Sequence, residues 1–284
     1  MFQKENKKQV KYSIIVTSIE GYAKTDKFFQ SLSIQKYKNF ELIFIDQSNS
    51  FKLFYIKKFN IKNFKYISIQ KTSLSNARNI GIKKARGKYF MFLDDDCYFD
   101  NLFLYKINFY LKFNFDLMGF QIKNNNENII VRKFKKNQFN HKYEIIRYLC
   151  SSNFVIKNNN KEFDNNLGVG SKHLAQSGED TDYLLRNFKK KKFFFQSKIS
   201  IYHPKPKDKI KLKKVLLYSI GQSVMLIKNR CFLILLISIM KNFLDLITKP
   251  KNFRIIYILG KLYGFFYYFY SRKKTTYYKL SNVD

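Results

Sequence analysis

The chain has 284 residues, which suits one large domain or one domain with an appendage, and its 45% hydrophobic content is enough for a sizeable core. Its 54 Lys and Arg residues against 20 Asp and Glu residues give a formal net charge of +34, which favours a negatively charged partner such as nucleotide phosphates, anionic lipid or an anionic acceptor. The lysines are scattered through every segment and arginine is a small minority, so we expect much of this charge on solvated faces and no specific nucleic-acid partner.

The first half of the chain alternates short apolar runs with helical patterns. A helix is predicted from a cap at Ser75 to a stop at Gly87. Strands joined by segments of this length imply right-handed crossovers and a largely parallel sheet, and hence an α/β fold. The four predicted buried strands are Tyr12–Thr17, Glu41–Asp46, Tyr66–Ile69 and Tyr89–Leu93.

The sequence of the second half of the chain predicts further strands, followed by a change in composition. A helix is expected to run from Phe163 towards the turn at Gly168, and a second helix is expected over Glu179–Asn187, with its acids in the first turn. After Pro206 the chain interleaves lysines with aliphatic and aromatic clusters, so we predict a catalytic domain over residues 1–206 and a basic, amphipathic helical extension over residues 207–284. The predicted strands of this half are Asp116–Ile122, Ser152–Ile156, Phe193–Phe195 and Ile199–Tyr202.

Three consecutive carboxylates, Asp94–Asp96, follow the predicted strand Tyr89–Leu93. Like charges this close repel one another unless a cation neutralises them. Strand ends are where open α/β sheets present ligand sites, and oxygen ligands favour Mg²⁺ or Mn²⁺ together with substrate phosphates. The triplet therefore predicts a metal and diphosphate site, and the alternative is an acidic turn without a ligand.

Other polar residues could join the triplet at the same sheet edge. Asp46 and Arg78 would serve the base or ribose and the phosphates of a nucleotide, although an Asp that ends a strand is commonly only a turn residue. Glu179 and Asp180 begin a helix, which suits either a general base or N-terminal capping. His203, which precedes a proline, is either a surface residue or an additional metal ligand if the fold returns it to the triplet.

In order and spacing, these motifs resemble glycosyltransferases of family 2 with the GT-A fold, over about residues 11–206. The resemblance implies a Rossmann-like, mostly parallel sheet flanked by helices, and an inverting transferase that uses a nucleotide-activated sugar. The matching segments are Ser13–Ser18, Leu42–Ser48, Leu74–Gly81, Ala85–Asp96, Phe163–Ser171, Ser177–Arg186 and Tyr202–Pro204.

The resemblance also implies roles for single residues. Thr17, Asp46 and Arg78 match nucleotide-contacting positions, and Asp94, Asp95 and Asp96 match the motif that holds diphosphate and metal, with Asp96 the expected direct ligand. Asp180 matches the base that deprotonates the acceptor hydroxyl, with Glu179 beside it, and His203 matches a further metal ligand. The expected reaction is hexosyl transfer to a glycan or lipid-linked acceptor in capsule, O-antigen or lipopolysaccharide synthesis, with residues 123–150 setting the acceptor.

The basic tail and the absence of a signal bear on location. No apolar region follows the basic N-terminal residues, no stretch of 18 uninterrupted apolar residues is present, and the three cysteines share no disulfide-type spacing, so we expect a cytoplasmic protein. Residues 207–284 are expected either to pack on the catalytic domain or to contact an anionic membrane at its inner face. The rival function is a catalytically inactive, basic GT-A-like protein that binds RNA or anionic membrane. A sugar-nucleotide nucleotidyltransferase is disfavoured, because Ser18–Lys24 lacks its glycine-rich loop.

Overall fold

A computed structural model describes residues 10–20, 25–48, 56–124, 142–187, 193–204, 211–248 and 252–280. The chain divides into two compact units. The first comprises residues 1–72, 77–162 and 187–205, and the second comprises residues 73–76, 163–186 and 206–284.

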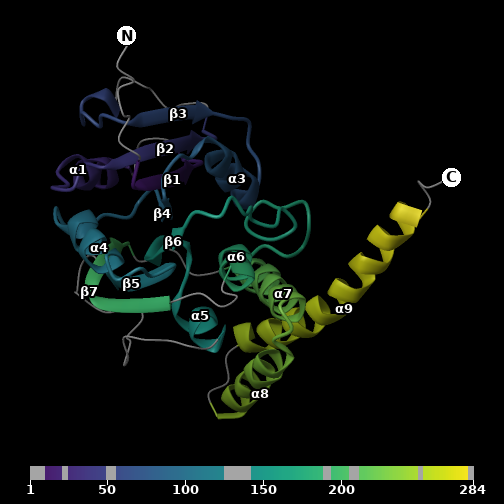
Figure 1. Cartoon of the computed structure of the whole chain (residues 1–284). Coiled ribbons are helices and arrows are strands. Elements are labelled where there is room, and N and C mark those ends of the chain that lie inside the picture. Colours follow the sequence, from purple (N-terminus) through teal and green to yellow (C-terminus); the bar gives the residue numbers. More distant parts are fainter. Residues whose placement is uncertain are drawn as a thin grey trace, which may run out of the picture. The chain divides into compact units, whose positions relative to one another are not determined.

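The first unit is built on a seven-stranded mixed sheet with the strand order β3-β2-β1-β4-β6-β5-β7 (Figure 1). β1 pairs in parallel with β2 and β4, and β2 with β3, which confirms the predicted parallel arrangement of the first four strands. β6 runs antiparallel to both β4 and β5, whereas β5 and β7 are parallel. The strands are β1 (Tyr12–Ser18), β2 (Phe40–Asp46), β3 (Phe64–Ser68), β4 (Tyr89–Asp94), β5 (Leu117–Asn124), β6 (Phe154–Lys157) and β7 (Phe193–His203).

The central strands read as continuous apolar runs because they are buried. Every residue of β2 is buried, and β1 and β4 are buried apart from one residue each. Such runs are typical of parallel strands whose two faces are both covered by helices. The helices assigned to this unit are α1 (Asp26–Ser33), α3 (Leu74–Lys84, whose first residues belong to the second unit), α4 (Phe103–Leu111) and α5 (Lys142–Tyr148).

Gly87 lets the chain pass close to β1 on its way into β4. A Cβ atom at this position would lie 2.4 Å from the Ser13 backbone nitrogen and 2.8 Å from the Tyr12 carbonyl carbon. Neither atom belongs to a flexible side chain, so relief requires a shift of the strand. We expect Gly87→Ala to lower the free energy of unfolding by about 1–3 kcal/mol, measured by urea denaturation. The neighbouring exposed change Lys84→Ala should stay within about 0.5 kcal/mol of the parent, and equal stability of both variants would contradict the close approach.

The second unit contains a loop over residues 163–178, helix α6 (Glu179–Asn187, up to residue 186 in this unit) and the helices α7 (Leu212–Lys228), α8 (Phe232–Thr248) and α9 (Asn252–Leu280). α9 packs closely against α7 at Gly260. A Cβ atom at this position would lie 2.7 Å from the Cβ of Ser219, so a larger residue would not fit without a shift. The expected helix over Glu179–Asn187 and the helical character of the C-terminal extension are confirmed. No helix among the described residues is both long and apolar enough to cross a bilayer.

The prediction of a helix that begins at Phe163 is wrong, because local hydrogen bonds form turns in this segment instead. The Asp164 carboxylate accepts the backbone N–H of Asn166 at 2.9 Å, which is a turn that competes with the helical pattern. Gly168 and Gly170 then take φ values of +98° and +77°, which lie outside the right-handed helical region. The predicted boundary between residues 206 and 207 falls among residues outside the described ranges, and it stays a prediction.

Candidate active site

The strand register of the first unit brings several predicted site residues to one sheet edge. Thr17 lies opposite Asp94 in the pairing of β1 with β4. Ser18, the next residue of β1, lies opposite Asp46 in the pairing with β2. All of these strands run in the same direction, so Thr17, Asp46 and Asp94 share the carboxyl edge, as the sequence predicts.

Asp94 ends β4 and has three polar neighbours. The Ser152 hydroxyl donates a hydrogen bond to its Oδ2 atom, and a guanidinium nitrogen of the buried Arg78 lies 3.7 Å from its Oδ1 atom. Burial by itself would raise the pKa of Asp94, but the close approach of His203 and the charge of Arg78 outweigh it and hold that pKa below its usual value. Asp94 is therefore a carboxylate at neutral pH.

His203 reaches the triplet through a bridge between two tyrosines. The backbone N–H of Tyr98 donates to the carbonyl of Tyr202 at 3.0 Å, and the N–H of Tyr202 donates to the carbonyl of Tyr98 at 2.8 Å. This antiparallel bridge places the residue after Tyr202 beside the residues before Tyr98. The Nε2 atom of His203 consequently lies 3.6 Å from an oxygen of Asp94 and 3.5 Å from an oxygen of Asp96.

The imidazole of His203 is oriented from its other side. Its Nδ1 atom lies 2.7 Å from the carbonyl oxygen of Pro204, so Nδ1 carries the proton that this carbonyl accepts. The nearby Asp94 carboxylate raises the pKa of His203 to about 9, against the opposing effect of burial. Without a cation His203 is therefore protonated at neutral pH, and its Nε2 atom would lose its proton on binding a metal. The carbonyl at Nδ1 orients the ring, as in histidines that bind metals.

The donor set fits a divalent cation. Asp94 and Asp96 each approach Nε2 of His203, and two carboxylates with one imidazole are ligand types that suit Mn²⁺ or Mg²⁺ completed by substrate phosphate oxygens. Among the described residues, the group whose ligand atoms all lie within 4.8 Å of one another is Asp94, Cys97 and His203, so Asp96 would have to move towards Asp94 to share one ion with it. The Cys97 Sγ atom lies within 4.8 Å of the ligand atoms of Asp94 and His203. Burial, followed by the neighbouring carboxylates, raises the pKa of Cys97 well above its ordinary value, so it remains a thiol and is a poor ligand.

Asp95, the middle residue of the triplet, has a carboxyl group that is hard to ionise. Burial raises the pKa of its carboxyl to about 6, and the charges of Asp96 and Asp94 act in the same direction, whereas a hydrogen bond with Ser18 lowers it. A cation bound beside Asp94 and Asp96 would reduce this repulsion. The three adjacent carboxyl groups are therefore suited to a site that holds positive charge.

Asp46 is fixed in position by its own neighbours. Its Oδ1 atom accepts the backbone N–H of Ser48 at 2.9 Å and the Ser48 hydroxyl at 2.6 Å. Its Oδ2 atom accepts the Tyr66 hydroxyl at 2.7 Å. A carboxylate offers about four acceptor positions, so one remains on Oδ2 for a ligand hydroxyl.

Glu179 and Asp180 lie in the second unit, in the first turn of α6. The N–H of Thr181 donates to Oδ1 of Asp180 at 2.8 Å, and Glu179 is buried. Gly178 precedes them with φ +89°, and a Cβ there would lie 2.9 Å from the Cβ of Met225. Glycine thus permits both the left-handed turn and the close packing that begin the helix.

Three polar contacts, one in the first unit and two in the second, were not predicted from the sequence. Ser152 lies just before β6, and it meets Asp94 only because β6 is antiparallel to β4. Asp182 is fully buried, and its carboxylate accepts hydrogen bonds from Nε of Arg186 at 2.7 Å and from Nζ of Lys228 at 3.0 Å. The spacing of Asp182 and Arg186 is a signal for an ion pair within the helix, whereas the contact with Lys228 depends on the tertiary fold.

The hydroxyl of Ser152 tests whether Asp94 is part of a metal site. Ser152→Ala removes the donor that orients the Asp94 carboxylate, and we expect Mn²⁺ affinity to fall by about 10- to 100-fold, measured by calorimetric titration of the metal. Ser33→Ala removes an exposed hydrogen bond within α1, in which the Ser33 hydroxyl donates to the carbonyl of Gln30, and it should leave the affinity unchanged. Parent-like Mn²⁺ binding by Ser152→Ala would exclude this orienting role.

Comparisons with known proteins identify the family to which the chain is similar. The family model described as glycosyl transferase family 2 matches residues 13–173. An uncharacterized glycosyltransferase of Rickettsia bellii is 33% identical over 109 residues, and a teichoic acid poly(glycerol phosphate) polymerase of Staphylococcus epidermidis is 36% identical over 111 residues. Each match covers 37% of this chain but only 15% of the length of the relative.

Solved structures show the same fold. S. aureus TarS residues 1–349 in complex with UDP-GlcNAc gives a TM-score of 0.56 at 17% identity and covers 76% of this chain and 66% of that one. The mannosyltransferase PcManGT from Pyrobaculum calidifontis, in complex with GDP-Man and Mn²⁺, gives a TM-score of 0.53 at 10% identity and covers 79% and 64%. The predicted α/β fold of the GT-A type is thereby confirmed.

Proposed function

The chain belongs to glycosyl transferase family 2, and on that premise we propose that it is an inverting transferase that moves a hexose from a nucleotide-diphosphate donor to an acceptor hydroxyl. The observation that carries the proposal is the convergence of Arg78, Asp94, Asp96 and His203 at the end of β4. A leaving diphosphate gains negative charge, and a cation held by the residues at the end of β4 would stabilise that charge.

In the donor half of the proposed site, each residue has one role. Asp94, Asp96 and His203 would hold Mn²⁺ or Mg²⁺, which supplies Lewis-acid stabilisation of the leaving diphosphate when bound. Arg78 would contribute a fixed positive charge near the phosphates, and Thr17 and Asp46 would contact the nucleoside. The complexes of TarS with UDP-GlcNAc and of PcManGT with GDP-Man and Mn²⁺ support a nucleotide-sugar donor and a divalent metal.

The acceptor half of the proposed mechanism depends on α6. We assign Asp180 as the base that takes the proton from the acceptor hydroxyl, with Glu179 beside it. An inverting displacement requires the hydroxyl to attack from the side opposite the leaving group, so the base must face the donor across the sugar. The first turn of a helix is a rigid support for such a carboxylate.

The proposed pathway is the assembly of a surface polysaccharide, namely capsule, O-antigen or lipopolysaccharide, with a glycan or lipid-linked acceptor. The similarity to a teichoic acid polymerase supports a cell-surface polymer in general terms. The proposed place of action is the cytoplasmic side of the membrane.

Helix α8 supports peripheral contact with an anionic membrane. It exposes apolar side chains at helical spacing, including Leu233 (69% exposed), Leu244 (60%) and Ile247 (66%), on a chain of net charge +34. We expect the protein to sediment with vesicles containing phosphatidylglycerol and to stay in solution with pure phosphatidylcholine. Leu236→Ser combined with Leu244→Ser should reduce this sedimentation, whereas Tyr105→Ser in α4 should not. Equal binding by the double variant would exclude α8 as the contact.

A panel of nucleotide sugars tests the proposed function. UDP-, GDP- and dTDP-sugars are titrated into the protein with Mn²⁺ or Mg²⁺ and then with EDTA, and the heat released is recorded. Metal-dependent binding of one donor, followed by its turnover with a candidate acceptor, is the expected result. Absence of binding in folded protein would instead favour a catalytically inactive, basic GT-A-like protein that binds RNA or anionic membrane. Salt-sensitive RNA binding would then separate those two partners.

A further inference from the structure

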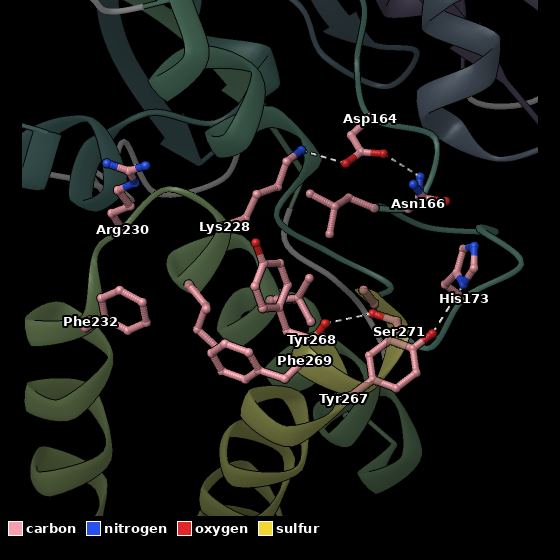
Figure 2. A pocket seen from close by; sticks show the side chains of 14 residues that line it. Asp164, Asn166, His173, Lys228, Arg230, Phe232, Tyr267, Tyr268, Phe269 and Ser271 are labelled. Carbon is pink, nitrogen blue, oxygen red and sulfur yellow. Dashed lines mark hydrogen bonds and ion pairs between the residues drawn. The ribbon is translucent and has the colours of Figure 1, made fainter. Parts of the chain in front are cut away.

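A cavity of about 650 Å³ lies within the second unit, between the loop over residues 163–178 and the helical extension (Figure 2). Its volume is in the range of small-molecule sites in proteins. None of the residues assigned above to the donor or to the base lines it. The loop contributes Asp164, Leu167 and His173, the α7–α8 region contributes Ile227, Lys228, Arg230 and Phe232, and α9 contributes Tyr267, Tyr268 and Phe269, among others.

The cavity presents apolar and aromatic surface to a ligand. Phe232, Tyr267, Tyr268 and Phe269 provide four aromatic rings, and Leu167 and Ile227 add aliphatic surface. Tyr267 is held in place by its hydroxyl, which lies 3.2 Å from the Nδ1 atom of His173. Such a lining favours an apolar chain.

Two basic residues of the cavity differ in how their charges are compensated. Lys228 is paired, since its Nζ atom lies 2.6 Å from Asp164 and 3.0 Å from Asp182. The guanidinium of Arg230 has no carboxylate partner among the residues that the structure describes. Arg230 therefore contributes the uncompensated positive charge of the lining, and Figure 2 shows it on the same side of the cavity as Phe232 and opposite His173.

The backbone of Arg230 is also unusual. Its φ is +58°, whereas the other non-glycine residues with positive φ in the described part of the chain are all asparagines, Asn60, Asn114 and Asn160. Asparagine tolerates this conformation and arginine does so less readily. A long cationic side chain thus stands where the backbone favours glycine or asparagine, in the lining of a cavity that is only partly apolar.

We propose that this cavity binds the acceptor of the transfer reaction, and that the acceptor is a hydroxyl-bearing glycan joined through a phosphate ester to an apolar chain. The glycan hydroxyl is the group that attacks the donor sugar and gives its proton to Asp180, and the cavity holds the phosphate and the apolar chain. The proposal rests on the function proposed above, and it specifies the acceptor class that was left as a glycan or a lipid-linked molecule. The guanidinium of Arg230 binds the phosphate, because arginine matches phosphate oxygens with two parallel N–H donors. The apolar chain lies against the aromatic residues of α9 and against Phe232.

Lys228 connects this cavity with the helix that carries the proposed base. Its ammonium group joins Asp164, which lines the cavity, to Asp182 of α6. Asn229, the next residue, donates to the other oxygen of Asp182 at 2.9 Å. All of these residues belong to the second unit, so an acceptor held in the cavity is positioned relative to the same helix as Asp180.

Titration of the full chain with farnesyl phosphate, followed by calorimetry below the concentration at which this probe forms micelles, tests the proposal. Farnesol lacks the phosphate, inorganic phosphate lacks the chain, and glucose 6-phosphate replaces the apolar chain by a sugar. We expect farnesyl phosphate to bind at least about tenfold more tightly than each of the three. Arg230→Gln should weaken farnesyl phosphate binding by about 10- to 100-fold and leave farnesol binding unchanged.

Matched variants keep the test decisive. Arg230→Gly also removes the charge, and a φ of +58° suits glycine, so this variant is expected to fold and to show the same loss. Lys241→Gln removes one positive charge from α8, outside the cavity lining, and should bind farnesyl phosphate like the parent. Parent-like binding by both Arg230 variants would overturn the proposal, and so would glucose 6-phosphate binding as tightly as farnesyl phosphate.

Donor binding is measured on the same samples. If a nucleotide sugar binds but farnesyl phosphate does not, the inference about the acceptor fails and the proposed transferase function stands. If farnesyl phosphate binds at Arg230 but no nucleotide sugar binds, the cavity is a phosphate-ester site and the transferase function fails. The two failures are therefore distinguishable.

Discussion

Asp180→Asn is expected to lower kcat for sugar transfer by about 10²- to 10⁴-fold while the Kd of the nucleotide sugar stays near that of the parent. The amide has the size of the carboxylate and can still accept the N–H of Thr181, which lies 2.8 Å from Oδ1, so the start of α6 should be preserved. The amide cannot take the proton of the acceptor hydroxyl. Initial rates at saturating donor and calorimetric titration of the donor separate the two effects.

Asp182 provides the contrast for that experiment. Its carboxylate is fully buried and is bonded to Arg186, Lys228 and Asn229, so Asp182→Asn should act on stability and lower the thermal midpoint. Asp180→Asn should leave the midpoint near that of the parent, because Asp180 is partly exposed. A loss of kcat below about tenfold in Asp180→Asn would remove this residue from the role of base.

Asp96→Ala is expected to reduce donor affinity by at least about 100-fold in the presence of Mn²⁺. Removing a residue that only orients a metal ligand already lowers metal affinity by about 10- to 100-fold, and removing a direct ligand should lower it further. Asp96 lies 3.5 Å from Nε2 of His203, so its removal takes one carboxylate from a set of three predicted ligands. Donor titrations with Mn²⁺ and with EDTA provide the measurement.

The metal dependence of the two proteins distinguishes a metal effect from a general loss of charge. In EDTA, the parent and Asp96→Ala should bind the donor with similar, weak affinity, because the cation that separates them is absent. Asp26→Ala removes an exposed carboxylate from α1 and should behave like the parent in both buffers. Full donor affinity of Asp96→Ala with Mn²⁺ would show that the triplet does not hold the metal.

The local sequence predicts most of the central sheet. The first four strands are found within two residues of their predicted ends, because buried parallel strands are continuous apolar runs bounded by polar residues. β6 is different, because nothing in its apolar sequence distinguishes an antiparallel from a parallel partner. The contact between Ser152 and Asp94, which follows from that direction, was consequently not predictable.

The candidate site shows the same division between local and tertiary information. Asp94–Asp96 were recognisable because three adjacent carboxylates are costly without a cation. The position of His203 depends on two backbone hydrogen bonds between Tyr98 and Tyr202, and the sequence pattern carries no signal for a bridge between such distant residues. The helix expected from Phe163 failed for a local reason, since the Asp164 side chain and two glycines favour turns over the helical pattern.

The antiparallel placement of β6 has a consequence for how this fold can diversify. β5 and β6 are hydrogen-bonded neighbours, so the chain that leaves β5 after Asn124 must return to an adjacent strand at Phe154, whatever lies between. Residues can be inserted, deleted or exchanged in the part of that connection that precedes Ser152 without moving the register of β4. If this connection sets the acceptor, as the sequence predicts, homologous chains can change their acceptor there while the carboxylates proposed to bind the donor stay in place.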